Sequence, residues 1–235
     1  MLGLFSFGPG GWGDELASGA LLTVELAIVT VPFGLIVGFL IALARQSEST
    51  LLRIFANGFA TVFRGLPELL TIFIVYYGGQ LLLQKIVGLV VANAEVSISS
   101  FSAGVVALGL VFSAFASEVF LGAFKGIPRG QYDAANALGL RRVATVYCVI
   151  FPQFVRLALP GIANLWLNLL KDTALVSVIA LNDLMRQTYV AVGATKQPFT
   201  FYLAACLIYL AMSIVSSFGI SAIERWSERG ARYVR

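Results

Sequence analysis

Histidine is absent from the 235-residue chain, and charged residues make up only 12% of it. A soluble domain carries about twice that share of charge, roughly 25%. The two cysteines, Cys148 and Cys206, stand far apart and fit no disulfide or metal-ligand spacing. Because nucleophile–base pairs are also missing, the sequence offers few groups for enzymatic chemistry, and an intramembrane enzyme is disfavoured.

Two further features are missing. No basic stripe with interleaved aromatic residues is present, since the aromatic residues lie inside apolar runs. Nucleic acid is therefore excluded as a partner. The first residues, MLGLFSFGPGGWGDE, contain neither a basic stretch nor an Ala-x-Ala cleavage site. We expect the first apolar segment to remain in the protein instead of being removed as a signal peptide.

Apolar residues, in contrast, make up 59% of the chain. A single soluble core cannot hide so much apolar surface, so the composition predicts an all-α polytopic membrane protein. Charged residues separate five apolar segments, which predicts one transmembrane domain over residues 1–235. The five helical spans are expected at about residues 16–44, 54–84, 97–124, 157–181 and 198–223.

Lysine and arginine residues gather on one side of these spans. Ten of them lie in the connection between spans one and two, in the connection between spans three and four, and in the C-terminal tail. They are Arg45, Arg53, Lys125, Arg129, Arg141, Arg142, Arg225, Arg229, Arg232 and Arg235. The opposite side has Lys85, Arg186 and Lys196, with acidic Asp14 and Glu15 near the N-terminus. The positive-inside rule then predicts an outside N-terminus and a cytoplasmic C-terminus.

A polar stretch, GIPRGQYDAANALGLRRVATVYCVIFP, separates spans three and four on the expected cytoplasmic side. Its alanines predict a short helix over residues 131–140, with Pro128 just upstream and Asp133 in the first turn. Gly139 supplies the stop. The small-residue surface of this helix suits close contact with another protein, but an interfacial helix that only closes a loop fits these features equally well.

The same stretch resembles the EAA signature of ABC importer permeases. The residues that carry this resemblance are Asp133 at the Glu position, Ala134, Ala135, Gly139 and Pro152, with Val149 and Phe151 in place of Ile and Leu. Two further stretches resemble segments of the polar amino-acid permeases, in their histidine, arginine and opine branch. They are FRGLPELLTIFIVYYGG and LPGIANLWLNLLKDTALVSVIALNDL. The resemblance extends from about Leu21 to Trp226.

This resemblance implies a subunit of the bacterial cytoplasmic membrane that imports polar, cationic amino acids or opines. A cytoplasmic ATPase dimer would be a separate partner, since no Walker pattern occurs in the chain. That ATPase would bind ATP and Mg, and this chain would hold no cofactor. Other implied partners are an extracytoplasmic binding protein and a second permease, with a paralogue favoured over an identical copy. Pro128, Asp133, Ala134, Ala135 and Gly139 would couple the chain to the ATPase.

Ionisable residues at bilayer depth usually face a cavity or a partner. Glu68 either points into a central pathway and receives a cationic group, or forms an ion pair with Arg64 one turn away. A structural or gating role near the cytoplasmic interface is favoured for Glu118, and a helix-packing or interfacial role for Glu25.

The fourth span adds further candidates for the pathway. Asn164 and Asn168 share one helical face and either line the pathway or form interhelical hydrogen bonds. The turn formed by Lys171, Asp172 and Thr173 either orients a bent span or contacts the ligand. A cation-selective channel that filters with its carboxylates and needs no ATPase is the rival function.

Overall fold

The computed structural model describes residues 2–8, 10–89 and 97–228. The tail arginines Arg229, Arg232 and Arg235 lie outside these residues. Every regular element in the described part is helical, and five helical segments are long and apolar enough to cross a membrane. The expected all-α fold with five spans is confirmed.

Two of the five spans are built from several helical segments each, and the other three are single helices. Their bounds are Gly13–Arg45, Glu68–Gly88, Ser100–Gly126, Arg142–Ile179 and Pro198–Arg225. The elements are η1 (Leu2–Phe5), α1 (Gly13–Arg45), α2 (Thr50–Gly65), α3 (Glu68–Phe73), η2 (Ile74–Gly78), α4 (Gly79–Gly88), α5 (Ser100–Gly126), α6 (Arg129–Ala137), α7 (Arg142–Thr145), η3 (Val146–Ile150), α8 (Phe151–Asp172), η4 (Thr173–Ile179), α9 (Leu184–Thr195) and α10 (Pro198–Glu228).

Helices α1 and α5 form the centre of the bundle. Small residues let them approach closely: a Cβ added at Gly38 would lie 2.8 Å from the Ser113 carbonyl oxygen and from the Ala116 Cβ. A side chain at Gly38 would therefore push the two helices apart. Around this contact, Leu26, Phe112 and neighbouring side chains form the main apolar core.

The expected second span, residues 54–84, is not one helix. Helix α2 ends at Gly65, Leu66 is extended with φ −87° and ψ 140°, and α3 begins at Glu68 after Pro67. Proline disfavours helical geometry in the residue before it and lacks an N–H for the helix ladder. Proline therefore divides the segment into helix α2 and a second helical segment, Glu68–Gly88, which is long and apolar enough to cross a membrane.

The fourth span also departs from a simple helix. A π-helical turn, η3, precedes α8, and a 3₁₀ segment, η4, follows it up to the left-handed Ala180 with φ 61°. The span thus begins at Arg142, well before the expected residue 157. Pro152 is the second residue of α8 and directly follows η3. Because proline has no N–H, it interrupts the helical hydrogen-bond ladder where the π-helical turn meets α8.

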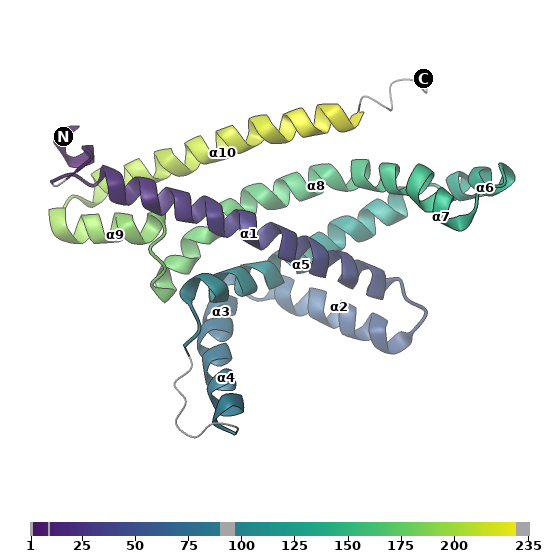
Figure 1. Ribbon diagram of the computed structural model, residues 1–235, viewed down its shortest axis with the longest axis horizontal. Coiled ribbons are helices and arrows are strands. Elements are labelled where there is room, and N and C mark those ends of the chain that lie inside the picture. Colours follow the sequence, from purple (N-terminus) through teal and green to yellow (C-terminus); the bar gives the residue numbers. More distant parts are fainter. Residues whose placement is uncertain (1, 9, 90–96, 229–235) are drawn as a thin grey trace.

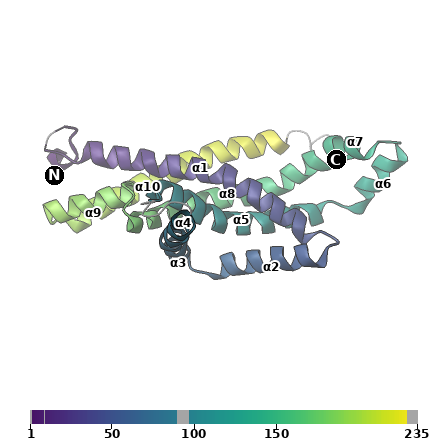
Figure 2. The ribbon, with the colours of Figure 1, turned by 60° about the horizontal axis from the view of Figure 1, so that its bottom comes forward.

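The bundle is elongated, and its two ends differ (Figures 1 and 2). Helices α6 and α7 lie at one end, together with the connection between α1 and α2. The N-terminus and α9 lie at the other end, while α3 and α4 project away from the bundle in Figure 1. We call these the α6 end and the α9 end.

Asp183 organises the α9 end. Its carboxylate caps α9 by accepting hydrogen bonds from the backbone N–H groups of Arg186 at 3.0 Å and Met185 at 3.4 Å. The next amide, of Leu184, donates to the Thr23 hydroxyl of α1 at 3.2 Å. Burial raises the pKa of Asp183 to about 6, although its hydrogen bonds from backbone amides oppose this rise.

Candidate functional site

A pocket of about 310 Å³ lies between α3, α5 and α8. Its apolar wall consists mainly of α5 side chains, with Phe112 and Phe115 among them. Its polar lining combines the first residue of α3 with the last turns of α8: Glu68, Asn168, Lys171 and Asp172. The Pro67 break places Glu68 at a helix start, and the change from α8 to η4 places Lys171 and Asp172 beside it.

The polar lining of this pocket favours a cation. Glu68 and Asp172 supply two carboxylates against the single ammonium of Lys171, a formal charge of −1. Because the remaining wall is apolar, these charges are screened less than in water and act strongly on a bound molecule.

The residues expected along the substrate pathway do not all meet here. Glu68, Asn168, Lys171 and Asp172 come together in the pocket. Asn164, one turn earlier on α8, is exposed and is not part of the lining. Thr173 is fully buried in the core, where its hydroxyl donates to the Leu170 carbonyl at 2.7 Å.

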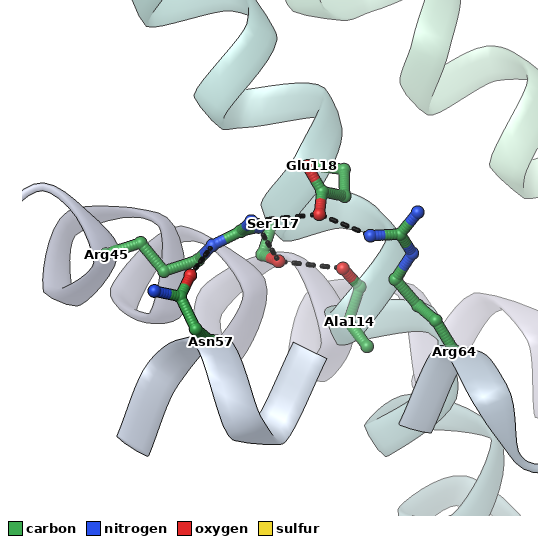
Figure 3. Close-up of polar contacts among 6 residues, drawn as sticks. All are labelled: Arg45, Asn57, Arg64, Ala114, Ser117 and Glu118. Atoms are coloured by element: carbon green, nitrogen blue, oxygen red, sulfur yellow. Dashed lines mark hydrogen bonds and ion pairs between the residues drawn. The ribbon is translucent and has the colours of Figure 1, made fainter. Parts of the chain in front are cut away.

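The expected alternative of an Arg64–Glu68 ion pair is wrong. Arg64 Nη1 instead pairs with Glu118 Oε1 of α5 (Figure 3), and Glu68 forms no ion pair with any described residue. The physical reason is the Pro67 break, which ends α2 before Glu68, so that the two side chains do not share a helix face. The Glu68 carboxylate is therefore left to the pocket.

Glu118 binds a second arginine as well. Arg45 of α1 places its Nη2 2.9 Å from Glu118 Oε1. The Nε of Arg45 donates a hydrogen bond to Asn57 Oδ1 of α2 at 2.9 Å. Arg45 Nη1 also donates to the Ser117 hydroxyl at 3.4 Å. We call Arg45, Asn57, Arg64, Ser117 and Glu118 the arginine cluster; it links α1, α2 and α5, as Figure 3 shows.

The arginine cluster lies next to the pocket, towards the α6 end. Glu118 follows the pocket residue Phe115 by one helical turn of α5, and the Arg64 guanidinium stands over the Phe115 ring at 5.7 Å. The sequence indicated Glu118 as structural or gating but missed Arg45 and Asn57. Their only signal was the polar character of Arg45 at the end of an apolar span and of Asn57 within an amphipathic helix.

The helix expected over residues 131–140 is α6, which begins at Arg129 after its N-cap, Pro128. It ends in a Schellman motif: Gly139 adopts φ 72°, its N–H donates to Asn136, and the Leu140 N–H donates to the Ala135 carbonyl at 3.1 Å. A Cβ at Gly139 would meet nothing within 4 Å, so a side chain there is opposed by backbone strain alone.

The other residues expected for coupling are divided between two faces of α6. Asp133 and Ala134 are exposed, whereas Ala135 is buried against the bundle. A hydrogen bond of 3.1 Å from Gln153 to Gln131 also ties α6 to the start of α8. Most of α6 is thus exposed, while Ala135 and the Gln153–Gln131 hydrogen bond hold the helix in place.

Comparison with known proteins gives consistent matches. The profile of a family described as "binding-protein-dependent transport system inner membrane component" matches residues 31–232. The nopaline transport system permease protein NocQ of Agrobacterium fabrum is 42% identical, over 98% of each chain. The arginine ABC transporter permease protein ArtQ of Escherichia coli K12 is 37% identical, over 92% of this chain and 96% of the relative.

A solved structure shares the fold. The crystal structure of an amino acid ABC transporter with histidines superimposes with a TM-score of 0.78 at 30% identity. The match covers 91% of this chain and 94% of that chain.

Proposed function

Because the chain belongs to the family of inner-membrane components of binding-protein-dependent transport systems, we propose that its pocket carries a cationic amino acid or opine across the membrane. The chain is the permease subunit of an ABC importer and not an enzyme. Its family implies three partners: an ATPase, a substrate-binding protein and a second permease. A paralogue as the second permease is part of the proposal.

The observation that supports this substrate class is that carboxylates outnumber cationic groups in an otherwise mostly apolar pocket. Glu68 and Asp172 are placed to receive a guanidinium or ammonium group, and Lys171 to receive the carboxylate of an amino acid. Charge-assisted hydrogen bonds of this kind are stronger than neutral ones. Asn168 adds a neutral donor and acceptor to the same lining. The similarity to nopaline and arginine permeases supports the assignment.

The proposal assigns energy coupling to α6. Its exposed face, with Asp133 and Ala134, would dock on the ATPase, while Ala135 anchors the helix to the bundle. Pro128 and Gly139 define where the helix begins and stops. ATP and Mg would be bound by the ATPase, and this chain would hold no cofactor. In this arrangement the α6 end and the C-terminus are cytoplasmic, and the N-terminus and α9 are outside.

The experiment that tests the function is uptake into liposomes that hold this chain with its ATPase, second permease and binding protein. Labelled arginine should accumulate against its gradient only when ATP is enclosed with the ATPase. An ATPase made inactive in its Walker lysine is the matched control and should abolish accumulation. Equilibration of arginine that proceeds equally without the ATPase would instead establish the rival function of a cation-selective channel.

A further inference from the structure

Helix α2 is attached to the bundle by very little apolar surface. Of its 16 residues, only Ala56 and Ala60 are buried. Leu51, Phe55 and Val62 are exposed, and Phe59 and Phe63 are half-buried. Burial of an apolar surface contributes about 25 cal/mol per Å², so two alanine side chains contribute little to the position of α2.

The arginine cluster holds α2 at two points instead. Asn57 accepts a hydrogen bond from Arg45, and Arg64 pairs with Glu118. Asn57 and Arg64 are seven residues apart, which places them on one face of α2 two turns from each other. Glu118 connects the two points because it also binds Arg45, whose side chain is only 13% exposed.

The same cluster touches the pocket by two routes. Through space, Arg64 stacks over Phe115, which is part of the pocket wall. Along the chain, Arg64 is followed within four residues by Glu68, the carboxylate of the pocket. The link between them includes Leu66 and Pro67, whose backbone is extended and restricted. A displacement of α2 would therefore also move Glu68.

We propose that Glu118 is a positioning residue for the transport pocket. It holds Arg45 and Arg64 together, fixes α2 on α5, and thereby sets where Glu68 faces the Phe115 wall. Glu118 itself does not line the pocket. The inference rests on the proposed function, because it assigns Glu68 the task of receiving the cationic group.

Removal of the Glu118 charge should release α2. Glu118→Gln leaves the guanidinium groups of Arg45 and Arg64 close together with no carboxylate between them. Like charges in a partly buried site repel, and a pair that has lost one partner is more costly than no pair at all. Glu68 would then lose its fixed place relative to Phe115, and the pocket would bind its cationic substrate less well.

The test compares Glu118→Gln with Glu48→Gln in the assembled complex, by transport kinetics and by hydrogen exchange. Glu48 is an exposed acid in the α1–α2 connection and matches the loss of charge. In Glu118→Gln the apparent KM for arginine should rise at least about fivefold, with maximal uptake per inserted protein within about twofold. Backbone exchange should accelerate in residues 50–73 and not elsewhere, whereas Glu48→Gln should behave like the wild type.

Two outcomes would overturn the positioning role. Faster exchange in residues 50–73 with an unchanged KM would leave the cluster purely structural. A raised KM with unchanged exchange would mean that Glu118 acts directly on the ligand. Arg64→Lys gives a second variant, which keeps the charge but loses the planar group over Phe115; it should change both readouts in the same direction and to a smaller extent.

The proposed function can fail separately. If the wild-type complex shows no ATP-driven uptake of arginine, the proposed function falls. The exchange comparison needs no substrate, and unchanged exchange of residues 66–73 in Glu118→Gln would still refute the positioning role.

Discussion

Glu68 owes its place in the pocket to the proline before it. Pro67 ends the preceding helix at Gly65, so Arg64 turns to Glu118 and the Glu68 carboxylate faces Asn168, Lys171 and Asp172. An acid at this depth is costly unless it has a partner. Lys171 lines the same pocket and supplies one ammonium group. Under the proposed function, the cationic group of the substrate would be a further partner for Glu68.

Glu68→Gln keeps the shape of the side chain and removes its charge. We expect uptake of arginine to fall at least several-fold, because removing one partner of a desolvated ion pair costs more than the roughly 0–1 kcal/mol that an exposed pair is worth. Uptake of a neutral analogue that the complex accepts should fall much less. The measurement is uptake of both ligands by liposomes that hold the full complex, normalised to inserted protein.

Lys125→Gln, an exposed charge at the end of α5, is a suitable control and should leave the selectivity unchanged. Equal loss for the charged and the neutral ligand in Glu68→Gln would contradict a role in charge recognition.

At the scale of single elements, the ends of α6 and α9 depend on particular residues. Helix α6 ends at a glycine in the left-handed conformation, and α9 begins at a buried aspartate. Both ends lie in connections between spans, where apolar packing determines little of the geometry. Backbone conformation and hydrogen bonds decide the local structure instead.

Gly139→Val should uncouple uptake from ATP hydrolysis while the protein still inserts. A β-branched residue disfavours φ 72°, and left-handed geometry costs L-residues about 1–2 kcal/mol, so the end of α6 would unwind. The measurement is uptake and ATPase activity of the complex at equal membrane abundance.

Gly139→Asn is the matched variant, because asparagine tolerates the left-handed region. It should retain most of the uptake. Normal uptake by Gly139→Val would refute the docking role of the α6 end.

The buried Asp183 predicts a pH dependence of stability. Its folded-state pKa of about 6 lies above the ordinary value of 3.8, so the folded protein holds a proton that the unfolded chain has lost between these values. Its contribution to stability is therefore greatest below about pH 4 and is lost as the pH rises through about 6. Asp183→Asn keeps the cap without the charge and should remove this slope and stabilise the protein at neutral pH.

Thermal unfolding of the purified complex, followed by tryptophan fluorescence from about pH 4 to about pH 7, measures this effect. Asp183→Ala separates the cap from the charge: it should destabilise the protein by about 0.5–2 kcal/mol through loss of the N-cap. An unchanged pH slope in Asp183→Asn would rule out Asp183 as its source.

At the scale of the whole molecule, the bundle separates two kinds of surface. Arg141 precedes α7 at the α6 end, and Lys196 follows α9 at the other end (Figure 1). One candidate span, Arg142–Ile179, lies between these two residues in the sequence, so we expect them on opposite sides of a membrane. The bias of lysine and arginine towards the α6 end predicts that this end is cytoplasmic.

Single cysteines at positions 141 and 196 test this orientation after replacement of Cys148 and Cys206, which are both exposed. In intact cells an impermeant maleimide should label position 196 and leave position 141 unlabelled. Permeabilised cells, in which both positions should react, control for accessibility. Labelling of position 141 in intact cells would reverse the orientation.

The sequence by itself determined the all-α class, the five spans and the family, because these depend on composition, on the spacing of charges and on contiguous motifs. It also indicated Gly139 as a helix stop, since the preference of glycine for a left-handed end is a local property. Asp183 could have been found in the same way, as an aspartate directly before a helix.

Only the tertiary structure decided which charges meet. Arg64 and Glu68 look like a pair four residues apart, but Pro67 separates them and Glu118, 54 residues beyond Arg64, takes the arginine. Asn164 and Asn168 share a helix face in sequence, yet only Asn168 reaches the pocket. Such contacts depend on how α1, α2, α3, α5 and α8 pack together, and side-chain spacing along one helix does not contain that information.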